Sequence, residues 1–348
     1  MHENRKLWMK RSEIQIIFFA LALAVAGCNN SITSNVIQEK EPYENNVELK
    51  IYFCPKQDCN SAMVNAVNNA QESVHCAFFD LELGELINSL SKKSREADVK
   101  VIIDKGNYEW EIEGDGIKTV ASKQYMHNKF CVVDGSTVLT GSMNPTNNDA
   151  FKNNNNLLII NSRYIAENYN DEFDELWKGI LSSGDNVKYA EINSSMGMIE
   201  NYFCPEDCTS EQGGGIYRMI GLVKNAKKSV KVASFSFTHE KLADELVKAS
   251  MRGINVSIVI ESKQRNVMES QYDRLKDFGL DIKVDGNKYN MHNKFIIVDD
   301  EIVITGSPNF TFSGNNRNDE NGVVIFNKDL ALKFDREFNN IFDDGEKI

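Results

Sequence analysis

The sequence contains the same motif twice, and this internal repeat constrains the fold more than any other feature. Residues 126–144 read MHNKFCVVDGSTVLTGSMN, and residues 291–309 read MHNKFIIVDDEIVITGSPN. A constant offset of 165 residues relates the two copies and also relates positions further along the chain without a gap. Self-similarity over such a length indicates that the chain folds as two related halves.

Each copy contains a histidine and a lysine two residues apart, then an aspartate, then a Gly-Ser-x-Asn sequence. These residues are His127, Lys129, Asp134, Ser142 and Asn144 in the first copy, and His292, Lys294, Asp299, Ser307 and Asn309 in the second. One histidine at a strand edge is usually an ordinary core residue, but a repeated histidine–lysine pair indicates a site. Cleavage of a phosphodiester needs a nucleophile, a proton donor for the leaving alkoxide, and cationic or hydrogen-bonding groups around the phosphate. Two imidazoles, two ammonium groups and the amide and hydroxyl donors would supply all three without a metal or another cofactor.

The repeated pattern resembles the phospholipase D superfamily, in which HxKx4D is followed by GSxN. The resemblance covers essentially residues 48–348, and it is closest to the compact branch of bacterial endonuclease-like and mitochondrial cardiolipin-hydrolase-like members. It implies an α/β fold of two pseudo-symmetric repeats, each a mixed β-sheet flanked by helices, packed about a pseudo-twofold axis with the site at their interface. It further implies a covalent phosphohistidine intermediate, and it makes Asp134 and Asp299 mainly structural, orienting members of the catalytic set.

The pattern of apolar residues predicts the same order of elements in each half. We expect the first repeat to span 48–187 and the second 197–348. The strands expected in the first half are 48–53, 73–79, 98–103, 129–133, 136–140 and 157–161, with helices at 60–71, 82–96 and 164–179. Those expected in the second half are strands 199–203, 229–236, 254–260, 294–298, 301–305 and 321–326, with helices 214–227, 239–252, 265–278 and 329–343.

The halves differ at a position that bears on the two histidines. Related proteins carry an acidic residue 28 positions after the motif histidine; the second half has Glu320 there and the first half has Asn155. A carboxylate beside an imidazole raises the histidine pKa, whereas an amide does much less. We therefore expect Glu320 to hold His292 as a protonated general acid, and His127 to be the neutral nucleophile.

The first residues of the chain have the features of an export signal. Residues 1–28 contain a basic segment, an apolar run of fourteen residues and the sequence Val-Ala-Gly-Cys. The run is short for a membrane span, which needs about twenty residues, but it is typical of a signal peptide. The sequence resembles a lipoprotein lipobox with Cys28 as the lipid anchor, the alternative being an uncleaved membrane anchor. Polar residues 29–47 are expected to form a flexible tether, and the protein to be extracytoplasmic and membrane-anchored.

The other six cysteines fall into two groups. Two short pairs, Cys54 with Cys59 and Cys204 with Cys208, follow matching Tyr-Phe-Cys-Pro sequences. In an oxidising compartment we expect two local disulfides, with a zinc site as the alternative. Cys76 and Cys131 lie in apolar strand-like runs and are expected to be buried free thiols.

The nature of the substrate stays open between three hypotheses. The membrane tether and the net charge of −12 favour a phospholipid at a membrane, because a nucleic-acid-binding domain is normally basic. The endonuclease-like texture of the motif favours an extracytoplasmic nuclease instead. A non-catalytic binding module is the least favoured, because both histidine–lysine pairs are intact. Since one chain carries both motifs, we expect a monomer to complete the site.

Overall fold

The computed structural model describes residues 42–107, 116–121, 123–210 and 213–347. Residues 41–348 form one compact unit. The expected signal peptide, Cys28 and most of the tether lie outside the described residues. Within the described part of the chain, no helix is long and apolar enough to cross a membrane.

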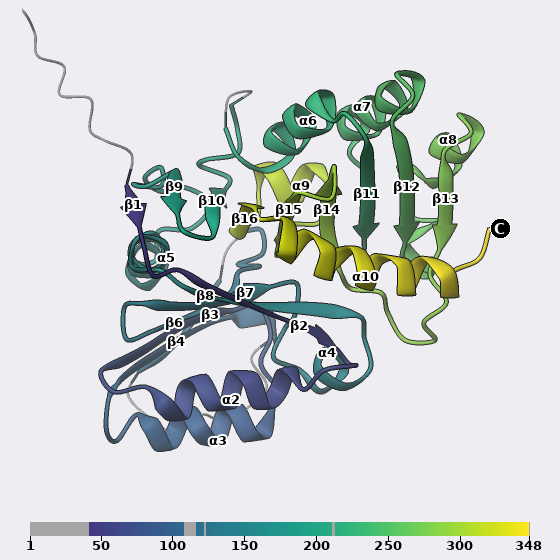
Figure 1. Ribbon diagram of the computed structural model, residues 1–348. Helices are drawn as coiled ribbons and strands as arrows, with labels where there is room; N and C mark the ends of the chain where they lie inside the picture. The colour runs from purple at the N-terminus through teal and green to yellow at the C-terminus, as the bar shows by residue number, and fades with distance from the viewer. Residues whose placement is uncertain (1–41, 108–115, 122, 211–212, 348) are drawn as a thin grey trace, which may run out of the picture. The chain divides into compact units, whose positions relative to one another are not determined.

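The first half is built on a seven-stranded mixed sheet whose strand order is β2-β8-β7-β6-β3-β4-β5. Two outer helices and the longer α5 flank it (Figure 1). The strands are β2 Glu48–Cys54, β3 Ser73–Phe78, β4 Asp98–Asp104, β5 Ile117–Val120, β6 Lys129–Val133, β7 Thr137–Gly141 and β8 Asn155–Asn161. The helices are α2 Cys59–Asn69, α3 Gly84–Lys93, the 3-10 turn η1 Lys105–Asn107, α4 Asn147–Phe151 and α5 Arg163–Lys178.

The second half repeats this arrangement in a nine-stranded sheet of order β1-β9-β10-β16-β15-β14-β11-β12-β13. The strands are β1 Tyr43–Glu44, β9 Glu191–Ser194, β10 Gly197–Cys204, β11 Ser229–Ser234, β12 Asn255–Ile260, β13 Asp281–Val284, β14 Lys294–Val298, β15 Ile302–Gly306 and β16 Glu320–Phe326. The helices are α6 Gly215–Asn225, α7 Glu240–Met251, the 3-10 turn η2 Ser262–Gln264, α8 Tyr272–Asp277, α9 Phe312–Asn316 and α10 Lys328–Asp344. The expected α/β class and the two flanked mixed sheets are confirmed.

Aromatic residues of both halves share one central core. Tyr169 of α5 packs edge-to-face on Phe203 of β10, and Phe53 of β2 packs in the same way on Phe334 of α10. Burial of large apolar side chains is the dominant favourable term in such packing. The halves therefore meet across an apolar core, whereas α2 with α3 and α6 with α7 cover separate outer cores.

Two expectations about local structure are wrong. The helix expected at 265–278 is reduced to α8, which begins only at Tyr272, because Met268 is exposed and Glu269 has a positive φ of 67° that ends helical backbone. The tether does not extend to residue 47. Strand β1 pairs with β9, and the Glu44 carboxylate accepts hydrogen bonds from Ser162 and from the backbone N–H of Arg163 at the start of α5.

The described part of the chain contains three disulfides. Cys54–Cys59 and Cys204–Cys208 close the short loops that follow β2 and β10, as expected from the matched spacing. The third, Cys76–Cys131, corrects the assignment of these two residues as free thiols. They lie directly opposite each other on antiparallel strands β3 and β6, with Cα atoms 4.0 Å apart. Only the strand register brings together cysteines that are 55 residues apart in the sequence.

We predict that the mature protein, purified without reductant, contains all three disulfides. Peptide mapping by mass spectrometry should recover Cys76 and Cys131 in one cross-linked peptide, and should find no free thiol at the other four positions. Free thiols at Cys76 and Cys131 under these conditions would contradict the disulfide between β3 and β6.

Candidate active site

The two motifs lie next to each other because each half holds the histidine of the other. His127 precedes β6, and its backbone N–H donates to the carbonyl oxygen of Asp319 in the second half at 2.9 Å. His292 precedes β14, and its N–H donates to the carbonyl of Asn154 in the first half at 2.8 Å. The two halves thus exchange equivalent contacts at their interface, where we expected the site.

The carboxylate partner of each histidine differs from our expectation. Glu320 does not hold His292. Its Oε2 lies 2.7 Å from Nδ1 of His127, in the other half. Nδ1 of His292 lies 3.0 Å from Oδ1 of Asn155 and 3.3 Å from Oδ2 of Asp149. Because β8 and β16 each begin at the interface, their first residues reach across it rather than back to their own motif.

Asp149 is a site residue that the sequence analysis missed. It lies at the position equivalent to Gly314 by the 165-residue offset, just as Asn155 is equivalent to Glu320. Each half therefore keeps one carboxylate, at a different place. A Cβ at Gly314 would lie 2.5 Å from the carbonyl of Asn309, so the second half has no room for the same solution. The sequence does contain a signal for Asp149. In the first half the acidic residue is at 149 and not at 155, whereas in the second half it is at 320 and not at 314.

Both lysines are buried beside the histidines. Lys129 is 2% exposed and Lys294 is 1% exposed. Their Nζ atoms donate to the carbonyls of His127 and His292 at 2.8 and 2.9 Å. A phenylalanine of the same half, Phe79 or Phe235, packs edge-to-face on each imidazole and lies under each ammonium group. The sequence analysis did not single out these two rings, although they too recur at a fixed offset.

Burial governs the ionisation of the site. It lowers the pKa of His127 to about 4, against the opposing effect of Glu320. Burial and then Lys294 also lower the pKa of His292, while Asp149 opposes them. The pKa of Lys129 falls to about 8, and that of Lys294 falls well below its usual range because of burial and the charge of Lys129. Burial therefore favours the neutral form of both imidazoles, with Nδ1 of each ring directed at a carboxylate and Nε2 on the opposite side of the ring.

Comparison with known proteins gives this geometry a family. The family model described as "Cardiolipin synthase, PLD-like domain" matches residues 63–177 and 219–342, one match in each half and more than half of the chain together. The chain belongs to the phospholipase D-like family.

Individual relatives are distant. The chain is 21% identical over 203 residues to a mitochondrial cardiolipin hydrolase from Chlamydomonas reinhardtii, covering 53% of this chain and 91% of that protein. It is 30% identical over 127 residues to a phospholipase D from Rickettsia prowazekii, covering 36% of this chain and 62% of that enzyme. Its fold is similar to that of phosphatidylserine synthase from Haemophilus influenzae Rd KW20, with a TM-score of 0.66, 16% identity and coverage of 86% and 87% of the two chains. The relatives support a phosphodiesterase of phospholipase D type.

The two motif serines of this phospholipase D-like site contact the residues that hold the histidines. Ser142 and Ser307 are fully buried, and their hydroxyl groups donate to Asn155 Oδ1 at 2.9 Å and to Glu320 Oε2 at 2.5 Å. They therefore orient the residues that hold the histidines. The Asn144 amide donates to Asp149 at 2.8 Å in the same way. For Asn309, the carbonyl oxygen is buried without a partner among the described residues.

Asp134 and Asp299 lie at the opposite ends of the motif strands from the histidines. Strand β6 has five residues, so at about 3.3 Å per residue Asp134 lies on the order of 15 Å from the site. Its carboxylate accepts the N–H groups of residues 71–73 at 2.7–3.0 Å, and Asp299 does the same for residues 227–229. Both therefore anchor the starts of β3 and β11. These contacts are of the structural, orienting kind that the family resemblance implies for the two aspartates.

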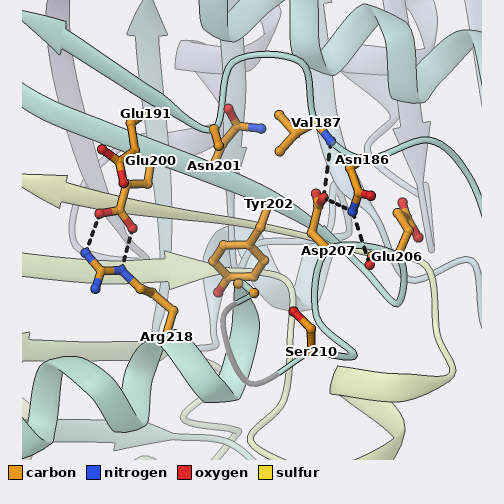
Figure 2. Close-up of a pocket in the computed structure, with 13 residues that line it drawn as sticks. Asn186, Val187, Glu191, Glu200, Asn201, Tyr202, Glu206, Asp207, Ser210 and Arg218 are labelled. Carbon is orange, nitrogen blue, oxygen red and sulfur yellow. Dashed lines mark hydrogen bonds and ion pairs between the residues drawn. The ribbon is translucent and has the colours of Figure 1, made fainter. Parts of the chain in front are cut away.

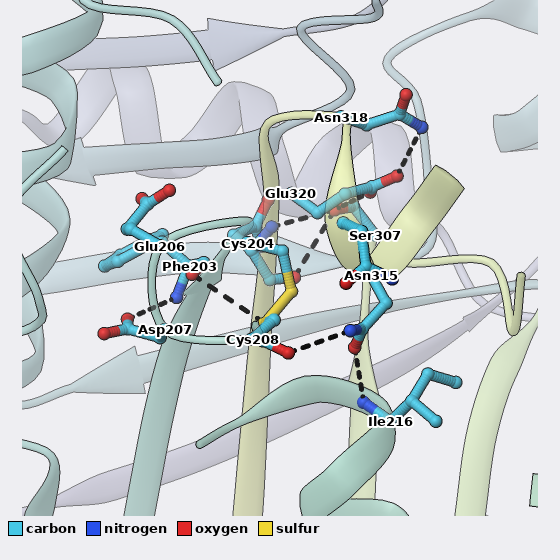
Figure 3. Close-up of a disulfide and its surroundings, with 12 residues drawn as sticks. Phe203, Cys204, Glu206, Asp207, Cys208, Ile216, Ser307, Asn315, Asn318 and Glu320 are labelled. Carbon is cyan, nitrogen blue, oxygen red and sulfur yellow. Dashed lines mark hydrogen bonds between the residues drawn. A yellow bond between two sulfur atoms is a disulfide. The ribbon is translucent and has the colours of Figure 1, made fainter. Parts of the chain in front are cut away.

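The short disulfides lie beside the partners of the histidines. In the strand register, Cys54 is opposite Asn155 and Cys204 is opposite Glu320. Figure 3 shows the Cys204–Cys208 disulfide close to Glu320, with Asn315 binding both the Cys208 carbonyl and the N–H of Ile216. Each disulfide thus restrains the strand end that presents a residue to the opposite histidine.

Three carboxyl groups with raised pKa values, those of Glu172, Glu206 and Asp319, lie close to the first motif. Glu172 of α5 accepts a hydrogen bond from Asn128, which lies between His127 and Lys129, and its carboxyl group also hydrogen-bonds that of Glu206 in the second half. Burial raises the pKa of Glu172, and it raises the pKa values of Glu206 and Asp319 to about 7. Glu206 also lines a cavity of about 420 Å³ that contains neither histidine (Figure 2).

We predict that these carboxyl groups make the protein less stable as the pH rises from 5 to 8. A raised carboxyl pKa means that the folded state holds protons that the unfolded state has already released, so stability falls as pH rises through the folded pKa. Glu206→Gln should remove on the order of 2–3 kcal/mol of this penalty at pH 8 and little of it at pH 5. Thermal unfolding at the two pH values measures the difference, and Glu240→Gln on the exposed start of α7 is the matched control.

Proposed function

We propose that this phospholipase D-like protein hydrolyses phospholipid phosphodiester bonds through a phosphohistidine, without a metal ion. The observation that carries the proposal is the symmetric pair of histidines, each with its own carboxylate across the interface and its own buried lysine. Both histidines come from one chain, so no second copy is needed to complete the pair.

His127 is the better candidate for the nucleophile, although not for the reason taken from the sequence. Its Nδ1 donates to the Glu320 carboxylate at 2.7 Å. This contact fixes the tautomer that leaves the Nε2 lone pair free, and the low pKa keeps the ring neutral. Nε2 attacks phosphorus, and the bond from phosphorus to the leaving alcohol oxygen breaks.

His292 is then the proton donor. The bound phosphodiester brings a negative charge that, together with Asp149, favours the imidazolium form of this histidine. Its Nε2–H is transferred to the leaving alkoxide, which departs as the free alcohol. The now neutral His292 takes a proton from water, the hydroxide oxygen bonds to phosphorus, and the bond to His127 breaks to release a phosphomonoester. Lys129 and Lys294 stabilise the charge on the phosphoryl oxygens throughout.

A phospholipid is the substrate that best combines these features. Two relatives are named for lipid hydrolysis, and the lipoprotein-type leader with Cys28 would hold the enzyme at an extracytoplasmic membrane surface. A nuclease is the second candidate, favoured by a set of exposed lysines around the site. The deciding assay offers the fragment 29–348 a phospholipid panel beside single-stranded and double-stranded nucleic acid.

We predict that turnover persists in excess EDTA. A bound phosphate anion favours the ammonium form of both buried lysines, which then supply the positive charge that a divalent cation would otherwise bring. Rates measured with and without chelator, and after adding back Mg²⁺, Ca²⁺ or Zn²⁺, should agree within about twofold. Loss of activity in EDTA with recovery on adding a cation would rule out the proposed mechanism.

A further inference from the structure

Five exposed lysines belong to segments that adjoin the two motif histidines, and none of them forms an ion pair with a carboxylate among the described residues. They are Lys105, Lys123, Lys152, Lys263 and Lys288. The chain as a whole has a net charge of −12, so this concentration of unpaired cations is opposite to the overall balance. Several exposed lysines elsewhere on the protein form ion pairs, for example Lys188 with Glu167 and Lys228 with Asp300.

Three of these lysines converge on Tyr289, and we call this group the Tyr289 cluster. The Nζ atoms of Lys152 and Lys288 lie 5.5 and 5.0 Å from the centre of the tyrosine ring. Lys263 Nζ donates to the Tyr289 carbonyl at 2.7 Å. Tyr289 is three residues before His292, and the next residue, Asn290, accepts the N–H of Asn154 at 2.9 Å. The cluster is therefore attached to the catalytic interface and receives residues from both halves.

The other two lysines line a cavity of about 520 Å³ together with Tyr125 and one carboxylate, Asp104; we call it the Tyr125 cavity. Asp104 already accepts the N–H of Met126, the residue before His127, at 3.1 Å. The Tyr125 ring packs edge-to-face on Phe79 at 5.4 Å, and Phe79 packs on His127 at 4.7 Å. The two groups are related by the internal repeat. Lys123 is equivalent to Lys288 by the 165-residue offset, and Lys105 and Lys263 both lie in the 3-10 turn after a parallel strand.

Aromatic rings near these lysines favour a lipid surface over a nucleic acid. Tyr125 and Phe151, which are close in sequence to Lys123 and Lys152, are each more than half exposed. Proteins that bind single-stranded nucleic acid stack bases on open aromatic rings. Here cations already lie over Tyr289. Ammonium groups beside partly exposed aromatic rings are instead the combination found at the membrane–water interface.

We propose that the Tyr289 cluster and the Tyr125 cavity form a seat for an anionic phospholipid bilayer. The lysines on either side of the histidines contact the phosphates of lipids that neighbour the one being cleaved, while the exposed rings enter the interfacial layer. The inference rests on the proposed function, because it assigns the substrate's surroundings to a lipid surface. It adds a binding surface separate from the residues that perform the chemistry.

Vesicle binding of an inactive enzyme tests the seat separately from turnover. The fragment 29–348 retains the compact unit 41–348 but lacks the expected lipid anchor, and His127→Ala prevents cleavage. Its binding is measured by sedimentation with vesicles of phosphatidylcholine alone or mixed with phosphatidylglycerol. A lysine near an anionic surface contributes about fivefold to binding, so Lys152→Gln with Lys288→Gln should weaken binding to the anionic vesicles about 25-fold. Lys105→Gln with Lys123→Gln should do the same, and guards against misfolding of the first pair.

The matched control removes the same number of positive charges at the opposite ends of the strands. Lys92 and Lys224 lie in the last turns of α3 and α6, which lead into the starts of β4 and β11. Asp134 and Asp299, not the motif histidines, lie at this end of the sheets. Lys92→Gln with Lys224→Gln should leave binding unchanged. Equal binding by all three variants would overturn the proposal. So would a loss of affinity for a single-stranded oligonucleotide with vesicle binding intact, which would assign the lysines to nucleic acid. Failure of the active enzyme to cleave a soluble chromogenic diester would refute the proposed function instead, without affecting the binding result.

Discussion

Replacing His127 by alanine should abolish turnover of both a phospholipid and a chromogenic nitrophenyl phosphodiester, by about a thousandfold or more. His292→Ala should cost as much with the phospholipid, because the alkoxide cannot leave without a proton. With the chromogenic diester, the leaving group is already a stable anion. His292→Ala should then keep a measurable first step, release nitrophenolate in a burst and accumulate phosphate on His127.

Acid-quenched enzyme analysed by mass spectrometry locates the phosphorylated residue. Lys100→Gln on β4, outside the site, serves as the matched surface control and should behave as the unmodified enzyme. Phosphate found on His292, together with activity of His127→Ala on the chromogenic substrate, would reverse the roles of the two halves. The near symmetry of the contacts around the two rings makes this a real alternative for the experiment to exclude.

Removing the two carboxylates should move opposite limbs of the pH–rate profile. Glu320→Gln deprives His127 of its carboxylate and lowers its pKa, so the acidic limb, where the nucleophile becomes protonated, should move to lower pH. Asp149→Asn deprives His292 of its carboxylate, so the proton donor is lost at lower pH and the basic limb should move down. Loss of the tautomer-fixing contact should also reduce the maximal rate of Glu320→Gln by about 10² to 10⁴.

Asp134→Asn is the matched control for these substitutions, since it makes the same chemical change within the motif but at the far end of β6. It should lower thermal stability, because its carboxylate holds three backbone N–H groups, and should leave both limbs in place. If Glu320→Gln moved the basic limb instead, Glu320 would act on the proton donor, and the assignment of His127 as nucleophile would fail.

The internal repeat, read from the sequence alone, was enough to predict the fold class, and it singled out the two histidine–lysine pairs. Motif strands β6 and β14 and helices α5 and α10 were expected at nearly their observed positions, because runs of apolar residues and helical spacing are local signals. The two histidine–lysine pairs were recognised because the same local pattern occurs twice. The helix expected at 265–278 failed for lack of a sustained local signal before Tyr272.

The pairing of groups across the interface was decided only by the tertiary structure. Glu320 and Asp149 each lie close in sequence to one histidine and bind the other, because β8 and β16 start at the interface and point across it. Within the halves, the tertiary structure also decided that Cys76 pairs with Cys131 and that Phe79 and Phe235 lie beside the motif histidines. A repeat in the sequence determines which residue types recur in each half. Which of them meet is set by how the two halves pack, since that packing joins atoms whose residues are more than a hundred positions apart.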